Sequence, residues 1–92
     1  MRAKRTDSNH AKLVRELRTA GFTVADTSGM GSGFPDLVIS RQRVTKLVEV
    51  KSPKGKLRLS QAEFISRWQD EVIVAKDVLD VINYFQQLVR IV

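Results

Sequence analysis

Apolar positions recur first at helical spacing and then in alternation, and this change of period predicts the elements in turn. Residues 8–20 carry apolar side chains on one helical face, and Gly21 is a typical stop signal for the helix. Asp7 or Ser8 is expected to cap its first turn. Residues 22–25 then alternate in the manner of a short, half-buried strand.

The middle of the chain contains two apolar runs separated by a tight turn. Residues 35–40 and 44–51 are rich in Val, Ile and Leu, and only Arg41-Gln42-Arg43 lies between them. Strands this close together predict an antiparallel hairpin. A two-residue loop would place Asp36 directly opposite Glu49, whereas a three-residue loop would put the two carboxylates on opposite faces.

The next predicted element is a helix over residues 60–69. Ser60 and Glu63 have the spacing of a capping box, and Leu59 and Phe64 have the spacing of a hydrophobic staple. These signals predict a helix that starts at Ser60.

The last part of the chain predicts one more strand and one more helix. Residues 72–75 are a short apolar run typical of a buried strand, and Asp77 is expected to cap a helix that ends near Val89. The order is helix, three strands, helix, strand, helix. This order predicts an α/β or α+β fold with a mixed sheet.

Composition limits the classes of function. The 92 residues, with 42% hydrophobic side chains, predict a single domain, 1–92, with one modest core. No apolar run is long enough for a membrane span, and no signal-peptide pattern is present, so we expect a cytoplasmic protein with no membrane partner. The absence of cysteine excludes disulfides and thiolate zinc sites.

The net charge of +6 favours nucleic acid as a partner. Lys54, Lys56 and Arg58 form a basic cluster after the second hairpin strand, and we expect them to contact DNA phosphates without reading the sequence. A solvated run of charges with no such partner is the alternative interpretation.

Three ionisable residues lie in strands whose other residues suit a sheet interior: Asp36, Glu49 and Lys51. An ionised group in a strand interior is costly unless it is paired or binds metal. Two opposed carboxylates, with the Val50 carbonyl, suit a hard divalent cation such as Mg²⁺, or Mn²⁺ as a substitute. Lys51 shares the face of Glu49 and would point at the same centre. A cross-strand ion-pair cluster on an exposed sheet face is the alternative.

The same residues carry a family resemblance. Pro35-Asp36 followed by Glu49-Val50-Lys51 resembles the signature of PD-(D/E)XK nucleases. The glycines at 29–33 directly before Phe34-Pro35-Asp36-Leu37, and the segment Leu59-Ser60-Gln61-Ala62-Glu63-Phe64, resemble the VRR-NUC (virus-type replication-repair nuclease) family more closely. The resemblance covers roughly residues 7–78 and is closest to small stand-alone members.

The resemblance implies a restriction-endonuclease-like αβββαβ core, here followed by a C-terminal helix. It implies a metal-dependent, structure-selective DNA endonuclease that acts on branched DNA, in particular a homodimeric resolvase of four-way (Holliday) junctions. Asp36, Glu49 and the Val50 carbonyl would be the metal ligands. Lys51 would be the catalytic lysine, and Gln61 would line the site.

Two other interpretations of the same fold stay open. One is a DNA-binding module that has lost catalysis, although an intact set of Asp36, Glu49 and Lys51 argues against it. The other is a nicking or restriction-type nuclease with sequence specificity. A chain of 92 residues leaves little room for a separate recognition domain, which disfavours this interpretation.

The first helix departs from the family pattern. The family often has a glutamate on the inner face of this helix, whereas here His10 occupies the best-placed position and Glu16 is expected to point sideways or outward. His10 is therefore a further candidate metal ligand, with Mn²⁺ better suited to imidazole than Mg²⁺. The alternative is a histidine that only packs on an apolar helix face.

The glycine loop lacks the Gly-Lys-Ser/Thr of a nucleotide-binding loop, so we expect no nucleotide cofactor. Gly31 and Gly33 are expected to let the backbone approach DNA or metal.

Two helices carry apolar side chains beyond the site. Phe64 and Trp68 are expected to belong to the core. The last helix is apolar over more of its surface than packing on a small sheet requires, which predicts a dimer surface near Tyr84 and Leu88.

Overall fold

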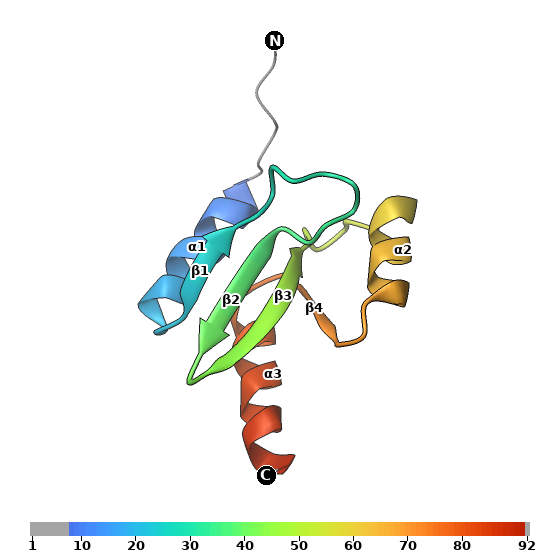
Figure 1. The fold of residues 1–92 in the computed structure, drawn as a ribbon. Helices are drawn as coiled ribbons and strands as arrows, with labels where there is room; N and C mark the ends of the chain where they lie inside the picture. The colour runs from blue at the N-terminus through green and yellow to red at the C-terminus, as the bar shows by residue number, and fades with distance from the viewer. Residues whose placement is uncertain (1–7, 92) are drawn as a thin grey trace.

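The computed structural model describes the backbone of residues 8–91 and the side chains of residues 9–88. Within this range the order of helices and strands is the predicted one (Figure 1). The elements are α1 (Ser8–Thr19), β1 (Thr23–Asp26), β2 (Leu37–Arg41), β3 (Val44–Val50), α2 (Leu59–Arg67), β4 (Val72–Ala75) and α3 (Val78–Ile91).

The four strands form one mixed sheet in the order β1-β2-β3-β4. The β1–β2 and β2–β3 pairs are antiparallel, and the β3–β4 pair is parallel. A parallel pair cannot be joined by a tight turn, and α2 lies in the crossover between β3 and β4. These features confirm the predicted α/β fold, an αβββαβ core followed by a C-terminal helix.

The hairpin of β2 and β3 has a two-residue loop, because Arg41 pairs with Val44, and this is the loop length that places Asp36 opposite Glu49. The two loop residues, Gln42 and Arg43, both have positive φ, at 53° and 69°. Positive φ at both central positions is the requirement of a type I′ turn, which matches the twist of the flanking strands. The turn therefore fixes the register of the hairpin.

The core lies on one face of the sheet, where α1 and α3 meet. Leu13 and Leu17 of α1 and Val81 and Phe85 of α3 are buried there. Alternate residues along the strands face these helices, as the two-residue period of a strand requires. The buried strand residues are Val24, Leu37, Ile39, Val48, Ile73 and Ala75.

Two helix boundaries follow local signals that the sequence showed. Gly21 has a φ of 95° just after α1, where a left-handed residue commonly ends a helix. The Asp77 carboxylate accepts the Asp80 N–H at 3.1 Å, which confirms Asp77 as the cap of α3. Asp7, the other expected cap of α1, lies outside the described residues.

The predicted start of α2 is wrong. The helix begins at Leu59 with Arg58 as its N-cap, and the Gln61 side chain accepts the Arg58 N–H at 2.7 Å. Gln61 therefore occupies the position that the prediction gave to Glu63. The expected staple is absent as well, since Leu59 is 75% exposed.

The predicted core role of Phe64 and Trp68 is also wrong. No residue of α2 is buried, Phe64 is half-buried and Trp68 is 44% exposed. The two rings stack on each other, and Phe64 also meets Phe34 edge to face. In Figure 1, α2 stands at the side of the sheet, away from α1 and α3.

Most of the described apolar side chains of α3 are used within the chain, although Leu79 is 60% exposed. Val78, Ile82 and Tyr84 pack against the core, and the Tyr84 hydroxyl donates to Glu71. Leu88 is half-buried.

In the part of the chain that the structure describes, no helix combines the length and the apolar character needed to cross a membrane.

Candidate active site

The hairpin register brings the two acidic residues of the predicted site together. Leu37 pairs with Val48, so continuing the register by one position places Asp36 opposite Glu49. Side chains of directly opposed residues lie on the same face of the sheet. Glu49 is 2% exposed, while Asp36 is half-buried just before β2.

Burial and the neighbouring carboxylate perturb Glu49. Loss of solvent raises the pKa of Glu49 to about 7, and the negative charge and hydrogen bond of Asp36 act in the same direction. The charges of Lys51 and Arg58 oppose the shift without cancelling it. Two carboxylates this close need a shared proton or a cation to coexist in a largely buried place.

The Gln61 side chain links α2 to the end of β3. Its Nε2 donates to Glu49 Oε2 at 2.6 Å, and its Oε1 accepts from Lys51 Nζ at 3.1 Å. The same Oε1 accepts the Arg58 N–H that starts the helix. One amide therefore fixes the carboxylate, the lysine and the first turn of α2 relative to one another.

Lys51 is held close to the carboxylates without a tight ion pair. Its Nζ lies 3.9 Å from Glu49 Oε2 and donates to the Lys56 carbonyl at 2.9 Å. The side chain is 14% exposed. A cationic group in this position can stabilise negative charge that develops nearby.

The backbone of Val50 completes the oxygen-rich end of β3. Its N–H donates to Asp36 Oδ2 at 3.0 Å. The hairpin register, continued two positions beyond Leu37, places Pro35 opposite Val50, and proline has no N–H to donate. In an antiparallel pair a residue directs its N–H and C=O toward the same neighbour, so the Val50 carbonyl faces the same side as Asp36.

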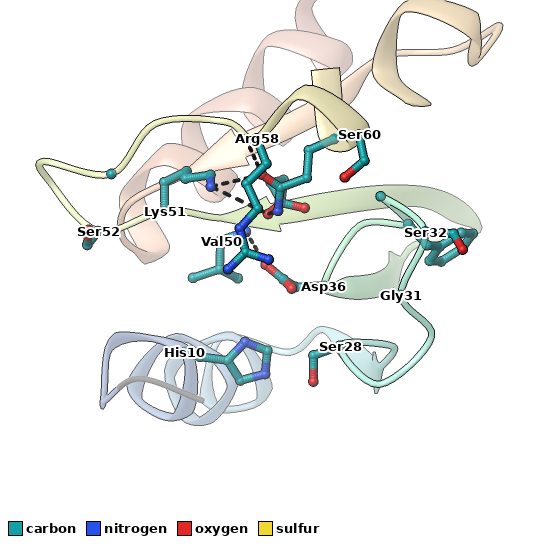
Figure 2. A pocket seen from close by; sticks show the side chains of 15 residues that line it. His10, Ser28, Gly31, Ser32, Asp36, Val50, Lys51, Ser52, Arg58 and Ser60 are labelled. Atoms are coloured by element: carbon teal, nitrogen blue, oxygen red, sulfur yellow. Dashed lines mark hydrogen bonds and ion pairs between the residues drawn. The ribbon is translucent and has the colours of Figure 1, made fainter. Parts of the chain in front are cut away.

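A cavity of about 300 Å³ opens at this end of the sheet (Figure 2). Lys54 and Lys56 are not among its lining residues; both are exposed in the segment before α2. The sequence-predicted residues that line it are His10, Gly31, Gly33, Asp36, Glu49, Val50, Lys51, Arg58 and Gln61.

Arg58 differs from the other residues of the basic cluster. It lines the cavity, and Figure 2 shows its guanidinium pointing into it. Its position at the start of α2 explains this, because the helix cap fixes its backbone beside the site.

The donor chemistry of the site suits a hard divalent ion. Asp36 and Glu49 offer carboxylate oxygens and Val50 offers a carbonyl, which are the ligand types that Mg²⁺ and Mn²⁺ take. Among the described residues, no cluster of three or more His, Asp and Glu could hold a metal. His10 therefore does not join Asp36 and Glu49 as a third side-chain ligand in this arrangement.

His10 is 6% exposed and belongs to a group that the sequence did not reveal. Its Nε2 lies 3.0 Å from Asp26 Oδ2, and Asp26 Oδ1 accepts both the N–H and the hydroxyl of Ser28, at 2.9 and 2.6 Å. Burial raises the pKa of Asp26, but the hydrogen bonds from Ser28 and His10 outweigh it and lower that pKa to about 2. Neither Asp26 nor Ser28 lies in a motif, so only the fold could show this group.

The glycine loop has a packing role that its sequence did not specify. Gly33 has a φ of 81°, and a Cβ built on it would lie 2.2 Å from the Ser60 carbonyl oxygen. The loop backbone therefore lies directly against the first turn of α2. Gly31 also has positive φ, at 74°, but a Cβ there would meet nothing within 4 Å.

Comparison with known proteins identifies the family of the chain. No match was found among curated proteins or among solved structures. The family model of the VRR-NUC domain matches residues 3–79, a range that contains Asp36, Glu49, Lys51 and Gln61. The chain therefore belongs to the VRR-NUC family of nuclease domains.

Proposed function

We propose that this chain is a divalent-metal-dependent endonuclease that cuts branched DNA, with four-way junctions as the main substrate. The observation that carries the proposal is the joining of Asp36, Glu49, Lys51 and Gln61 by hydrogen bonds and register at one end of the sheet. The family membership supports a nuclease with DNA as its substrate.

Each residue has a distinct part in the proposed reaction. Asp36, Glu49 and the Val50 carbonyl would hold the divalent ion, either Mg²⁺ or Mn²⁺. When bound, such an ion makes water more acidic and stabilises charge on the leaving oxygen. Gln61 accepts from Lys51 Nζ, and the ammonium group lies 3.9 Å from Glu49, beside the proposed metal ligands. From this position Lys51 stabilises the extra negative charge on the phosphorus centre in the transition state.

The surroundings of the cavity suit a DNA backbone. Arg58 enters the cavity, and Lys54 and Lys56 are exposed in the same segment. Cations at these positions neutralise phosphates of the DNA backbone beside the cavity. Gly31 and Gly33 also line the cavity, and neither adds a side chain to the loop at its own position, which allows the strand to approach the backbone there.

We also propose that two copies act together. Resolution of a four-way junction needs two symmetric cuts, and a two-fold homodimer supplies one site for each. Exposed apolar side chains for such contact lie at the two ends of α2 and on β4: Leu59, Trp68 and Val74 are 75%, 44% and 45% exposed. This surface replaces α3 as the proposed interface. Sedimentation at micromolar concentration tests it, and a single active species near 10.4 kDa would contradict the dimer.

The experiment that tests the function compares four-way, flap and linear DNA of the same sequence. Each is incubated with the purified chain in Mg²⁺, in Mn²⁺ and in EDTA. We expect cleavage only with a divalent ion and fastest on the four-way junction. Equal cleavage of linear duplex would remove the structure selectivity, and no cleavage of any substrate would refute the nuclease.

A further inference from the structure

His10 is a polar residue at the end of an apolar helix face. Leu13, Val14 and Leu17 of α1 are all buried in the core, and His10 continues their row with 6% exposure. A leucine would pack there at lower cost, because burying a polar group needs compensating hydrogen bonds. Unlike Leu13, Val14 and Leu17, His10 also lines the cavity that holds Asp36 and Glu49.

The orientation of the His10 ring is set from β1 and the loop after it. Asp26 is ionised over the working pH range because its pKa is lowered to about 2. An ionised carboxylate only accepts hydrogen bonds, so the His10 Nε2 that lies 3.0 Å away carries a proton. Two hydrogen bonds from Ser28 fix the other oxygen of the same carboxylate. The backbone N–H and the hydroxyl of Ser28 therefore hold the Asp26 carboxylate in its place beside the His10 ring.

Charge is unevenly distributed around the cavity. Lys51 and Arg58 supply cations on the side of α2, and Asp36 and Glu49 supply anions on the sheet. Helix α1 contributes His10 to the lining, and Figure 2 shows its ring on the side of the cavity opposite Lys51, with the Arg58 guanidinium pointing into the cavity between them. A phosphodiester group in the cavity thus meets the cations of Lys51 and Arg58 and, on the side of α1, the imidazole.

We propose that His10 is a catalytic residue that contacts the scissile phosphodiester group, and that Asp26 is a positioning residue that holds the ring for this contact. The inference rests on the proposed nuclease function and adds two residues to it. A protonated imidazole donates from both ring nitrogens, so a ring with a carboxylate on one side can also donate to a phosphate.

Four variants test the proposal on a four-way junction with Mn²⁺: His10→Leu, Asp26→Asn, the double variant, and Lys12→Gln as a control on the exposed side of α1. Thermal unfolding, kcat, KM and DNA affinity in EDTA are measured for each. His10→Leu should keep the thermal stability and lower kcat by about 10²-fold, the range for loss of one group that stabilises a transition state. Asp26→Asn should lower kcat less, because the amide still accepts from Ser28 but changes which His10 nitrogen is protonated.

The double variant separates a positioning role from an independent one. If Asp26 acts through His10, the double variant is no slower than His10→Leu alone, whereas independent roles would multiply. A His10→Leu variant with kcat within about twofold of wild type overturns the proposal, as does a double variant with multiplied effects. A wild-type chain that cuts no DNA refutes the proposed function and this inference with it. A wild-type chain that cuts, beside an equally active His10→Leu variant, refutes this inference alone.

Discussion

Replacement of Gly33 by alanine should disturb the site through the backbone rather than through a lost functional group. The added Cβ would lie 2.2 Å from the Ser60 carbonyl oxygen and 2.6 Å from its carbon, and neither atom belongs to a flexible side chain. The first turn of α2 must then move away from the loop. Gln61 follows Ser60 directly, so its bonds to Glu49 and Lys51 should lengthen.

The size of the effect can be estimated against Gly31→Ala as a matched control. Both glycines have positive φ, and a non-glycine residue in that region costs about 1–2 kcal/mol. Only Gly33→Ala adds the overlap with α2, for which forced repacking costs about 1–3 kcal/mol more. Since each kcal/mol lowers the Tm of a domain this size by about 4–8 °C, Gly33→Ala should unfold about 4–24 °C below Gly31→Ala.

Thermal unfolding of both variants, followed by circular dichroism, measures this difference, and single-turnover cleavage measures the effect on the site. We expect Gly33→Ala to be the less stable of the two and to cut DNA more slowly than wild type. Equal Tm values for the two alanine variants would show that the loop does not press on α2. The packing argument would then be wrong.

Three further predictions concern the charged residues. Lys51→Met should lower kcat by about 10²-fold at saturating DNA while affinity in EDTA stays unchanged; a loss confined to affinity would make Lys51 an ordinary phosphate contact. Neutralising Lys54 and Lys56 to glutamine should reduce the slope of log K against log salt by up to about 1.8, whereas an unchanged slope would show that they face away from DNA. In metal-free buffer the raised pKa of Glu49 means that the native state binds the proton more tightly than the unfolded chain, so the free energy of unfolding should fall as pH rises from 4.5 to about 7. Chemical denaturation across this range should show the loss in wild type but not in Glu49→Gln, and the same loss in both would assign it elsewhere.

The sequence was sufficient to predict the hairpin, and its consequence for the site depended on a loop length that the structure supplied. Only three residues separate the two strands, and an even loop with alternating side chains leaves one register that places Asp36 opposite Glu49. The cap of α3 at Asp77 was equally local. Such features depend on residues close together in the chain.

The features that sequence missed depend on contacts between distant segments. Asp26 and His10 are sixteen residues apart and meet only because β1 packs beside α1. The start of α2 shifted because Gln61 takes part in both the helix cap and the Glu49–Lys51 network. Trp68 is exposed because α2 stands beside the sheet instead of covering its core.

The central claim is that Asp36 and Glu49 together support metal-dependent cleavage. The most direct test measures cleavage of a four-way junction in Mg²⁺ or Mn²⁺ by Asp36→Asn and Glu49→Gln, with Glu63→Gln as a control on the exposed surface of α2. The Asn and Gln side chains keep the shapes of Asp36 and Glu49 and remove their negative charges. We expect neither site variant to cut DNA, both to bind it in EDTA as wild type does, and the control to cut normally. Cleavage at the wild-type rate by either site variant would contradict the account.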